Sequence, residues 1–324
     1  MTDDVRVSLI ICAYTLDRWD DIQEALASIR AQTRPPEEVI LVIDYNQALL
    51  TRALAAFGRE VRVVPNAEAR GLSGARNTGI ALSTGEILAF LDDDAVAAPD
   101  WLALAVGGCL APDVLGVSSW VEPIWMAPRP SWFPEEFLWT VGCSYRGLPR
   151  ESCEVRNLTG GTMVLKREVF ARAGQFNSRL GRSNGNLISC EETELCMRAR
   201  QQFPGGRFLH LPHCKVGHKV TAQRLTWRYF WRRCRAEGVS KAQLVQLVQQ
   251  RDPLSTERGY VLRTLGSGVL LGLWELLRYA RPAGPKRAAA ILLGLSATVS
   301  AYAPVMWRSR GIGAARSLRT SDAA

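Results

Sequence analysis

The residues of this chain with the clearest chemical potential are three consecutive carboxylates, Asp92-Asp93-Asp94. They follow the apolar run Ile87–Leu91, which has the composition of a buried strand. Adjacent negative charges repel at short range, so the cluster becomes favourable when a divalent cation lies among its oxygens. Oxygen ligands suit Mg²⁺ or Mn²⁺, and a cation at the end of an α/β strand is well placed to hold a diphosphate. The alternative is a solvated acidic turn ahead of a helix that begins near Asp100.

The segments that would position this triplet alternate apolar runs with amphipathic stretches, which is the pattern of βαβ units. Strands are expected at residues 7–13, 39–43, 61–64, 87–91, 163–165 and 207–211, and helices at 22–29, 49–57 and 191–202. Residues 71–82 are expected to form a loop that enters a helix. The apolar composition of the early strands predicts an α/β fold whose mostly parallel sheet has helices on both faces. In such a sheet the carboxyl ends of the strands converge on one crevice, where the residues that follow each strand would meet.

The charge of this 324-residue chain is distributed unevenly. Its formal net charge is +9, yet the part from Lys215 onward holds 19 Lys and Arg against 5 Asp and Glu. That part is also strongly apolar, which favours an anionic membrane surface over nucleic acid as its partner. The eight scattered cysteines indicate reduced intracellular thiols, and the acidic start of the chain predicts no secretory signal.

Two domains are expected: a first domain over residues 1–220 and a basic, apolar helical extension over 221–324. Within the extension, the uncharged run Ala288–Trp307 is about long enough to span a bilayer. Polar residues inside that run and basic residues on both flanks favour a pair of interfacial or re-entrant helices over a clean span. Helices packed on the first domain are the alternative.

The order of motifs along Val7–His218 resembles that of the family 2 glycosyltransferases, whereas the Gly-x-Gly-x-x-Gly and P-loop signatures are missing. The motifs are Val7–Tyr14, Gln32 before Pro35-Pro36, Val39–Asp44, Asn66-x3-Arg70-Gly71-Leu72-Ser73-x-Ala75-Arg76-Asn77-x-Gly79, Leu91-Asp92-Asp93-Asp94, Gly160-Gly161 and Glu191-Glu192-Thr193-Glu194-Leu195. The resemblance implies the GT-A fold, with a Rossmann-like, mostly parallel sheet. It also implies an inverting enzyme that uses a nucleotide-diphospho-sugar as donor and Mg²⁺ or Mn²⁺ as cofactor.

In this resemblance, residues that follow the first strands bind the donor. Ala13 and Tyr14 would hold the nucleoside, and Asp44 would accept a hydrogen bond from the base. For Asp44 the alternative is a turn-forming role. Arg70 and Arg76 would face the same crevice, where one or both would pair with the diphosphate. For Arg76 the alternative is an arginine on the surface of a helix.

The carboxylate triplet takes the place of the family's Asp-x-Asp motif. Asp92 would contact the ribose or the metal, and Asp94 would ligate the cation directly. Asp93 could contribute to either task. His218 would be a further metal ligand or a diphosphate contact, with a structural role as the alternative. A cation held there would stabilise the negative charge of the departing nucleoside diphosphate.

The general base of the family comes from a Glu-Asp pair at the start of a helix, and this chain has Glu191-Glu192 instead. Glu192 occupies the place of the usual Asp and is the expected base, with Glu191 as the alternate. The longer side chain of Glu192 shifts its carboxylate by about one C–C bond, which could matter for catalytic placement. An acidic first turn of an ordinary helix is the alternative.

The acceptor hydroxyl is expected to belong to a glycan, a lipid-linked molecule or a small molecule. Five prolines between residues 121 and 150 predict a long surface loop, whose tryptophans either shape the acceptor site or anchor the loop. The expected location is the cytoplasm, peripheral or monotopic at the inner face of the plasma membrane. An inactive sugar-nucleotide-binding membrane scaffold and a nucleotidyltransferase are the rival functions.

Overall fold

A nine-stranded sheet forms the centre of the computed structural model, which describes residues 5–183, 185–248, 254–279 and 282–321. The sequence-based expectation about a signal segment falls partly on residues outside these ranges. The strand order is β3-β2-β1-β4-β8-β6-β9-β5, and β7 pairs with β9. The strands are β1 (Val7–Ala13), β2 (Glu38–Ile43), β3 (Arg62–Pro65), β4 (Ile87–Asp92), β5 (Ala95–Ala97), β6 (Val114–Trp125), β7 (Cys153–Val155), β8 (Met163–Lys166) and β9 (Arg207–Val220).

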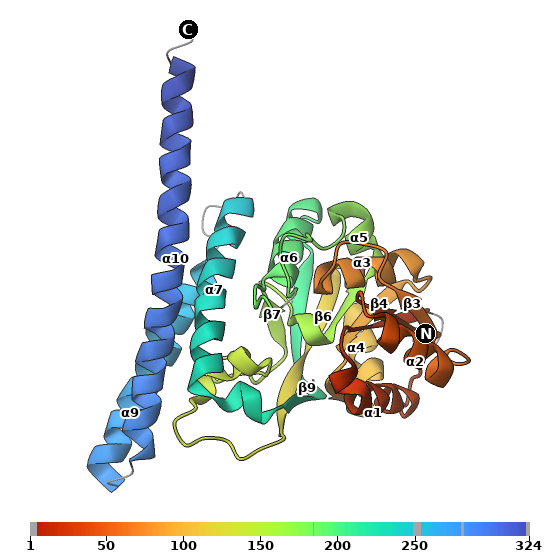
Figure 1. Cartoon of the computed structure of the whole chain (residues 1–324), viewed down its shortest axis with the longest axis horizontal. Helices are drawn as coiled ribbons and strands as arrows, with labels where there is room; N and C mark the ends of the chain where they lie inside the picture. The colour runs from red at the N-terminus through yellow and green to blue at the C-terminus, as the bar shows by residue number, and fades with distance from the viewer. Residues whose placement is uncertain (1–4, 184, 249–253, 280–281, 322–324) are drawn as a thin grey trace.

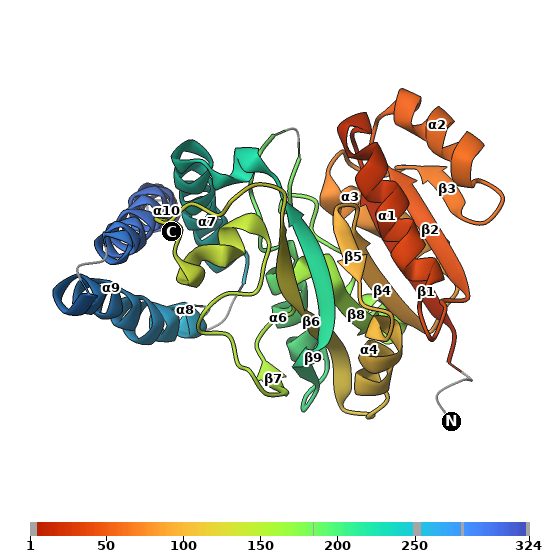
Figure 2. The same cartoon turned by 90° about the horizontal axis from the view of Figure 1, so that it is seen from below.

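The first four strands pair in parallel, as the sequence predicts. Their side chains alternate between two cores, so that Leu9 and Ile11 of β1 face one core and Ile10 faces the other. Helices α1 (Trp19–Arg30), α2 (Gln47–Phe57) and α4 (Trp101–Cys109) pack on the first core. Helices α3 (Leu72–Leu82), α5 (Arg167–Ala173) and α6 (Glu191–Gln202) pack on the second. The expected α/β fold with covered faces is therefore confirmed (Figure 2).

The later strands make the sheet mixed, because β8 lies antiparallel between β4 and β6. The predicted loop over residues 121–150 is wrong at two places: β6 continues to Trp125, and Glu135–Val141 form a largely buried 3-10 helix, η2. Beyond Ser118, β6 pairs only with β9 among the described strands, so Pro123 lies on an open edge where its missing N–H costs no ladder bond. The strand expected at 207–211 extends to Val220 as β9.

The extension is helical, as expected, and packs beside the sheet (Figure 1). Its helices are α7 (Trp227–Leu247), α8 (Ser255–Gly259), the π-helical turn Tyr260–Leu265, α9 (Gly266–Tyr279) and α10 (Ala283–Ser321). One apolar cluster joins both parts of the chain, with Phe133 and Phe137 from the loop region and Phe230 and Ile291 from the extension. The ring of Trp132 stacks on that of Trp227, with centroids 3.9 Å apart, so at this tryptophan the loop is anchored to the extension.

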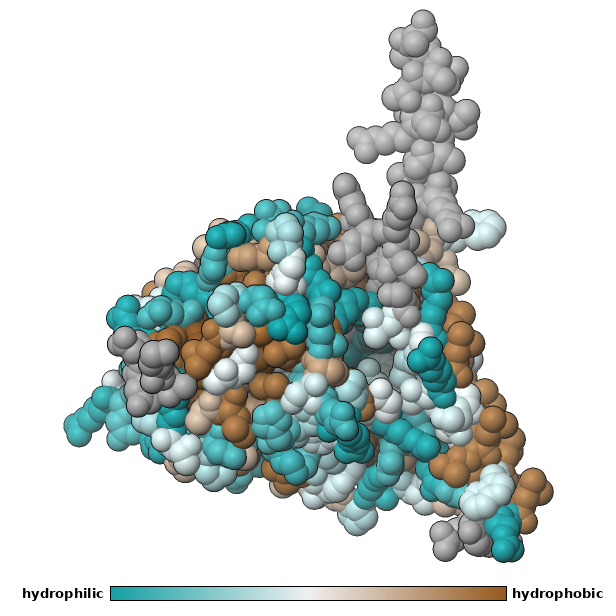
Figure 3. All heavy atoms as spheres, turned by 180° about the vertical axis from the view of Figure 1, so that it is seen from behind, coloured by the Kyte–Doolittle hydropathy of each residue, from teal (hydrophilic) through white to brown (hydrophobic). Residues whose placement is uncertain are grey.

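The segments Thr256–Arg278 and Ala283–Trp307 are long and apolar enough to cross a membrane. Only 17% and 28% of their most apolar stretches are buried, unlike the core helices of a soluble protein. Exposed apolar side chains include Leu262, Leu270, Leu277, Leu292 and Trp307. Figure 3 shows apolar side chains gathered along the edge formed by these helices. These two segments suggest that the chain associates with a membrane.

Candidate active site

The pairing of β5 with β9 brings the carboxylate triplet against His218. Strand β4 ends at Asp92, the chain turns through Asp93 and Asp94, and β5 starts at Ala95. Because β5 runs antiparallel to β9 with Ala95 opposite His218, residues far apart in sequence become neighbours. The N–H of Lys219 donates to the carbonyl of Asp94 at 2.9 Å, which fixes this register.

Asp92, Asp94 and His218 form a group that could hold a metal ion. One ligand atom from each lies within 4.8 Å of the others, and His218 Nε2 is 3.2 Å from Asp94 Oδ1. The back of the His218 ring lies against Gly142, where a Cβ would be 3.0 Å from His218 Cε1. Two carboxylate oxygens and one imidazole nitrogen are donors that fit a divalent cation such as Mn²⁺.

Two arginines that the sequence analysis did not single out contact the triplet. Arg18 Nη1 donates to Asp93 Oδ1, and Arg18 Nη2 lies 3.1 Å from Asp94 Oδ2. Arg224 Nη2 donates to the same Asp94 oxygen at 3.0 Å. Arg18 lies five residues after Ala13, and Arg224 lies six residues after His218. This closeness in sequence to expected site residues was the one feature that could have pointed to these arginines.

The charged groups around the triplet shift the pKa values of Asp93 and Asp94 in opposite directions. Burial opposes ionisation of Asp94, yet the charges of His218, Arg18 and Arg224 hold the pKa of Asp94 well below its usual range. Burial raises the pKa of Asp93 to about 7; the charge of Arg18 opposes this shift, and the charges of Asp94 and Asp92 add to it. Asp94 is therefore the better anionic ligand, whereas Asp93 faces Arg18 and is not part of the triad.

The expected nucleoside residues meet at the carboxyl ends of β1 and β2. The N–H of Asp44 donates to the carbonyl of buried Ala13 at 2.8 Å, and Tyr14 is 56% exposed beside them. The Asp44 carboxylate accepts from the N–H of Gly71 at 3.0 Å and from Asn66 Nδ2 at 2.7 Å, so it also holds the turn before α3. The Asp44 carboxylate thus takes the turn-forming role that was the alternative for it, and its role toward the nucleotide stays a prediction.

The two expected diphosphate arginines differ in their surroundings. Arg70 is exposed, and its guanidinium lies 5.9 Å from the centroid of the Tyr45 ring. Arg76 is buried on α3, so a role as a surface arginine is wrong for it. Arg76 donates to Glu191 Oε1 at 2.8 Å and to the carbonyl of Gly160 at 2.9 Å. It also lies 3.6 Å from Asp92 Oδ1 and so joins the triplet to the start of α6.

The acidic pair at the start of α6 contains two carboxylates with different environments. Glu191 is buried in its ion pair with Arg76. Glu192 is partly exposed and faces Gly160, where a Cβ would lie 3.6 Å from Glu192 Oε2. Desolvation and the adjacent charge of Glu191 raise the pKa of Glu192 to about 8. A carboxylate with a raised pKa is a stronger proton acceptor once it is ionised.

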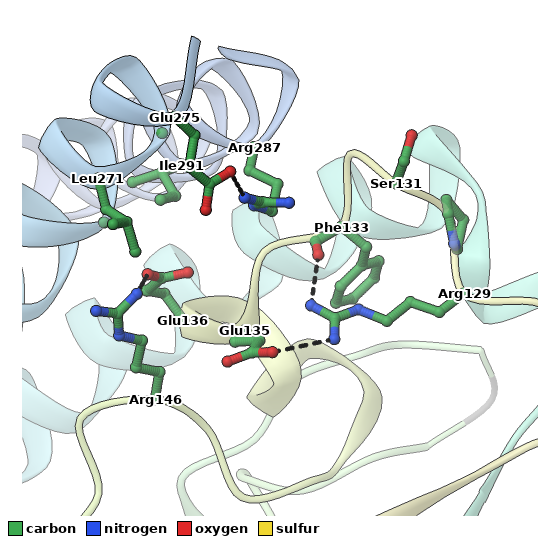
Figure 4. Close-up of a pocket in the computed structure, with 13 residues that line it drawn as sticks. Arg129, Ser131, Phe133, Glu135, Glu136, Arg146, Leu271, Glu275, Arg287 and Ile291 are labelled. Carbon is green, nitrogen blue, oxygen red and sulfur yellow. Dashed lines mark hydrogen bonds and ion pairs between the residues drawn. The ribbon is translucent and has the colours of Figure 1, made fainter. Parts of the chain in front are cut away.

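A separate cavity of about 330 Å³ lies between the loop region and the helices α9 and α10 (Figure 4). Three ion pairs line it: Arg129 with Glu135, Arg146 with Glu136, and Arg287 with Glu275. Because its arginines and glutamates balance each other, this cavity lacks the excess positive charge that an anionic donor would require. The group formed by the carboxylate triplet and His218 is the better candidate for the active site.

Comparison with known proteins agrees with this geometry. Residues 8–174, just over half of the chain, match the family described as glycosyl transferase family 2. The chain belongs to glycosyltransferase family 2. It is also 36% identical, over 245 residues, to the glucosyl-dolichyl phosphate glucuronosyltransferase of Haloferax volcanii, covering 73% of this chain and 76% of the relative.

Solved structures of glycosyltransferases share the fold of this family 2 chain. The mannosyltransferase PcManGT of Pyrobaculum calidifontis, in complex with GDP-Man and Mn²⁺, has a TM-score of 0.58 and 18% identity, covering 91% of this chain and 87% of its own. GalNAc-T7 with UDP, GalNAc and Mn²⁺ has a TM-score of 0.50 and 20% identity, covering 67% of this chain and 43% of its own. The resemblance stated from motifs is confirmed, as are the GT-A fold and an enzyme that uses a nucleotide sugar.

Gly161 offers a test of the close approach between β4 and the loop before β8. A Cβ at this position would lie 2.4 Å from Asp92 Oδ2, closer than non-bonded atoms tolerate. We therefore expect Gly161→Ala to displace the Asp92 carboxylate and to weaken Mn²⁺ binding about tenfold or more, as measured by isothermal titration. Gly107→Ala is the matched control, because no atom lies within 4 Å of its Cβ. Unchanged Mn²⁺ affinity in a folded Gly161→Ala protein would contradict the assignment of Asp92.

Proposed function

We propose that this family 2 enzyme catalyses an inverting, metal-assisted sugar transfer in a single displacement. The reaction would take place between the carboxylate triplet Asp92-Asp93-Asp94 and the acidic pair Glu191-Glu192. The observation that supports this most directly is Arg76, which contacts both the metal-binding triad at Asp92 and the acidic pair at Glu191. In this proposal the leaving diphosphate binds beside the triad and the base lies at the start of α6, with the Arg76 guanidinium between them. Such an arrangement is compatible with attack opposite the leaving group.

The leaving-group side consists of Asp92, Asp94 and His218, which would hold Mn²⁺ or Mg²⁺. When bound, the cation would offset the charge that develops on the nucleoside diphosphate as the sugar bond breaks. Arg18 and Arg224 already contact Asp94. Once the Asp94 carboxylate rotates to bind the metal ion, both guanidinium groups would be free to bind the donor phosphates. Ala13, Tyr14 and Asp44 would bind the nucleoside, and Arg70, which is exposed beside Tyr45, would pair with the diphosphate.

The base side is the start of α6. Glu192 would remove the proton from the acceptor hydroxyl, because its carboxylate is partly exposed and carries the raised pKa. Glu191 is engaged by Arg76 and would orient the arginine rather than take the proton. The bond from the acceptor oxygen to the anomeric carbon forms as the bond to the diphosphate breaks, and the configuration inverts.

The acceptor is a lipid-linked molecule at an anionic membrane surface in this proposal. The Haloferax volcanii relative is named for an acceptor carried on dolichyl phosphate, and the exposed apolar segments of this chain could lie at such a surface. The extension over residues 221–324 would then form the membrane-associating unit at the inner, cytoplasmic face. A donor panel of UDP-glucuronate, UDP-glucose and GDP-mannose, offered with glucosyl-dolichyl phosphate and Mn²⁺, tests the activity. NMR of the product linkage tests the inversion.

Replacement of a triad ligand tests the metal. Asp94→Asn removes a charged oxygen donor, so we expect Mn²⁺-dependent binding of UDP or GDP to weaken at least tenfold in titration calorimetry. Asp113→Asn is the control, since this exposed carboxylate pairs with Arg207 at the start of β9, at the other end of that strand from His218. Equal Mn²⁺-dependent affinity in the wild type and Asp94→Asn would exclude the triad as the metal site.

Replacement of the base separates an enzyme from a binding scaffold. We expect Glu192→Gln to lower kcat by about a hundredfold or more and to leave nucleotide binding within twofold, because an amide cannot accept the proton. In the wild type, protonation of Glu192 below its pKa of about 8 should make kcat/KM fall about tenfold per pH unit on the acidic side. Full turnover by Glu192→Gln, or a pH profile flat from 6 to 9, would contradict the role of Glu192.

Vesicle flotation tests the membrane surface. We expect the full chain to float with phosphatidylglycerol vesicles, and Leu270→Glu with Leu277→Glu to reduce that binding about tenfold, since both side chains are highly exposed on α9. Leu54→Glu is the matched control, because Leu54 is 49% exposed on α2, away from the extension. If the wild type stays with the soluble fraction at low salt, the membrane proposal is wrong.

A further inference from the structure

We propose that helix α7 of the extension positions the catalytic base, and that Ser240 and Glu237 are positioning residues for the transfer reaction. The two side chains bind Ser189, three residues before Glu192. This inference rests on the proposed role of Glu192 as the base. It gives the extension a task in catalysis besides membrane association.

The backbone turn before α6 has an unfavourable conformation that contacts from other elements must stabilise. Cys190, the residue before the helix, has φ of +77°, a left-handed conformation that is unfavourable for a residue with a Cβ. No side-chain hydrogen bond caps the helix at Cys190. Surrounding structure must therefore hold this turn if Glu191 and Glu192 are to keep their places.

Helix α7 supplies that support through two hydrogen bonds to Ser189. The N–H of Ser189 donates to Ser240 Oγ at 3.0 Å, and Ser189 Oγ donates to Glu237 Oε2 at 3.0 Å. Ser240 is completely buried, and its own hydroxyl proton goes to the carbonyl of Ala236 at 2.8 Å. That bond leaves a lone pair of Ser240 Oγ directed at the Ser189 N–H.

The acceptor Glu237 is itself held from two sides along α7. Arg233 Nη1 lies 2.9 Å from Glu237 Oε2, and Lys241 Nζ lies 3.4 Å from Glu237 Oε1. These partners sit one helical turn before and after Glu237, so its carboxylate is fixed in direction. Arg233 Nη2 also contacts Ser189 Oγ at 3.3 Å. Ser189 is thus held by three side chains of one helix.

Ion pairs also connect the same helix to the segment that leads to Gly160. Lys241 Nζ pairs with Glu257 of α8 at 2.8 Å, and Glu257 forms two bonds of 2.7 Å with Arg156. Arg156 lies four residues before Gly160, the residue that faces Glu192 and Arg76. Glu257 belongs to the segment that begins the first apolar helix. Helix α7 therefore connects the base, the Gly160 loop and the apolar helices.

The expected kinetic signature follows from where these bonds lie. The nucleoside and metal residues are carried by β1, β2, β4 and β9, whereas α7 holds the turn before α6. Loss of a bond to Ser189 should displace Glu192 and leave donor binding intact. A misplaced base lowers the rate of the chemical step, so the effect should fall on kcat and not on the donor KM.

The test compares Ser189→Ala and Ser240→Ala with the wild type in the full chain. We expect each variant to lower kcat about tenfold, with the donor KM and the Mn²⁺-dependent affinity for UDP or GDP within twofold of the wild type. Ser296→Ala is the matched control, because this exposed serine of the extension bonds only its own helix among the described residues. Circular dichroism and thermal melting verify that the variants fold.

The outcomes separate this inference from the proposed function. If Glu192→Gln is inactive while both serine variants keep kcat within twofold, the inference is wrong and the base assignment stands. If Glu192→Gln turns over normally, the base assignment itself fails. Should Ser240→Ala not fold, Ser189→Ala decides the question, since it leaves every ion pair of α7 in place. A parallel loss of donor affinity in the folded serine variants would also overturn the positioning role.

Discussion

The structure depends on the compensation of negative charge at the carboxyl edge of β4. Three successive aspartates at a buried strand end would repel one another, and the fold surrounds them with Arg18, Arg224 and His218. In such a poorly solvated place, Coulomb interactions are strong enough to give neighbouring carboxyl groups very different pKa values. Asp94 is held ionised while Asp93 is pushed toward its neutral form. Asp94 therefore stays available as an anionic ligand, while the arginines offset much of the negative charge of the triplet.

The buried guanidinium of Arg76 extends this arrangement to the acidic pair at the start of α6. Arg76 lies between Asp92 and Glu191 and also bonds the carbonyl of Gly160. Breaking a buried pair leaves an uncompensated charge, so Arg76 constrains all three segments together. Glu191 is buried in its ion pair with Arg76, whereas Glu192 is partly exposed, so the two adjacent glutamates have different surroundings.

The extension shares its core with the catalytic part. Phe133 and Phe137 pack against Phe230 and Ile291, and Gly238 lets α7 approach α10 so closely that a Cβ there would lie 2.1 Å from the Thr298 carbonyl. An element packed this tightly transmits displacement, because a dense interior has few voids to absorb it. The domain boundary expected between residues 220 and 221 stays a prediction. The two parts of the chain that it would divide pack into one apolar cluster.

The sequence by itself determined the family, the acidic motifs and the strands and helices of the first half up to β4, because hydrophobic periodicity depends on neighbouring residues. It did not reveal β5, β6 or β7, which pair with strands distant in the sequence. Only the tertiary structure decided which charges meet. Arg18, Arg224 and Glu237 contact partners dozens to more than a hundred residues away, or residues in another element, and no local pattern encodes those encounters. The burial of Arg76 and the distinction between Glu191 and Glu192 also follow from long-range packing. Sheet register and helix docking set these distances, and electrostatic energies depend on distance and burial rather than on position along the chain.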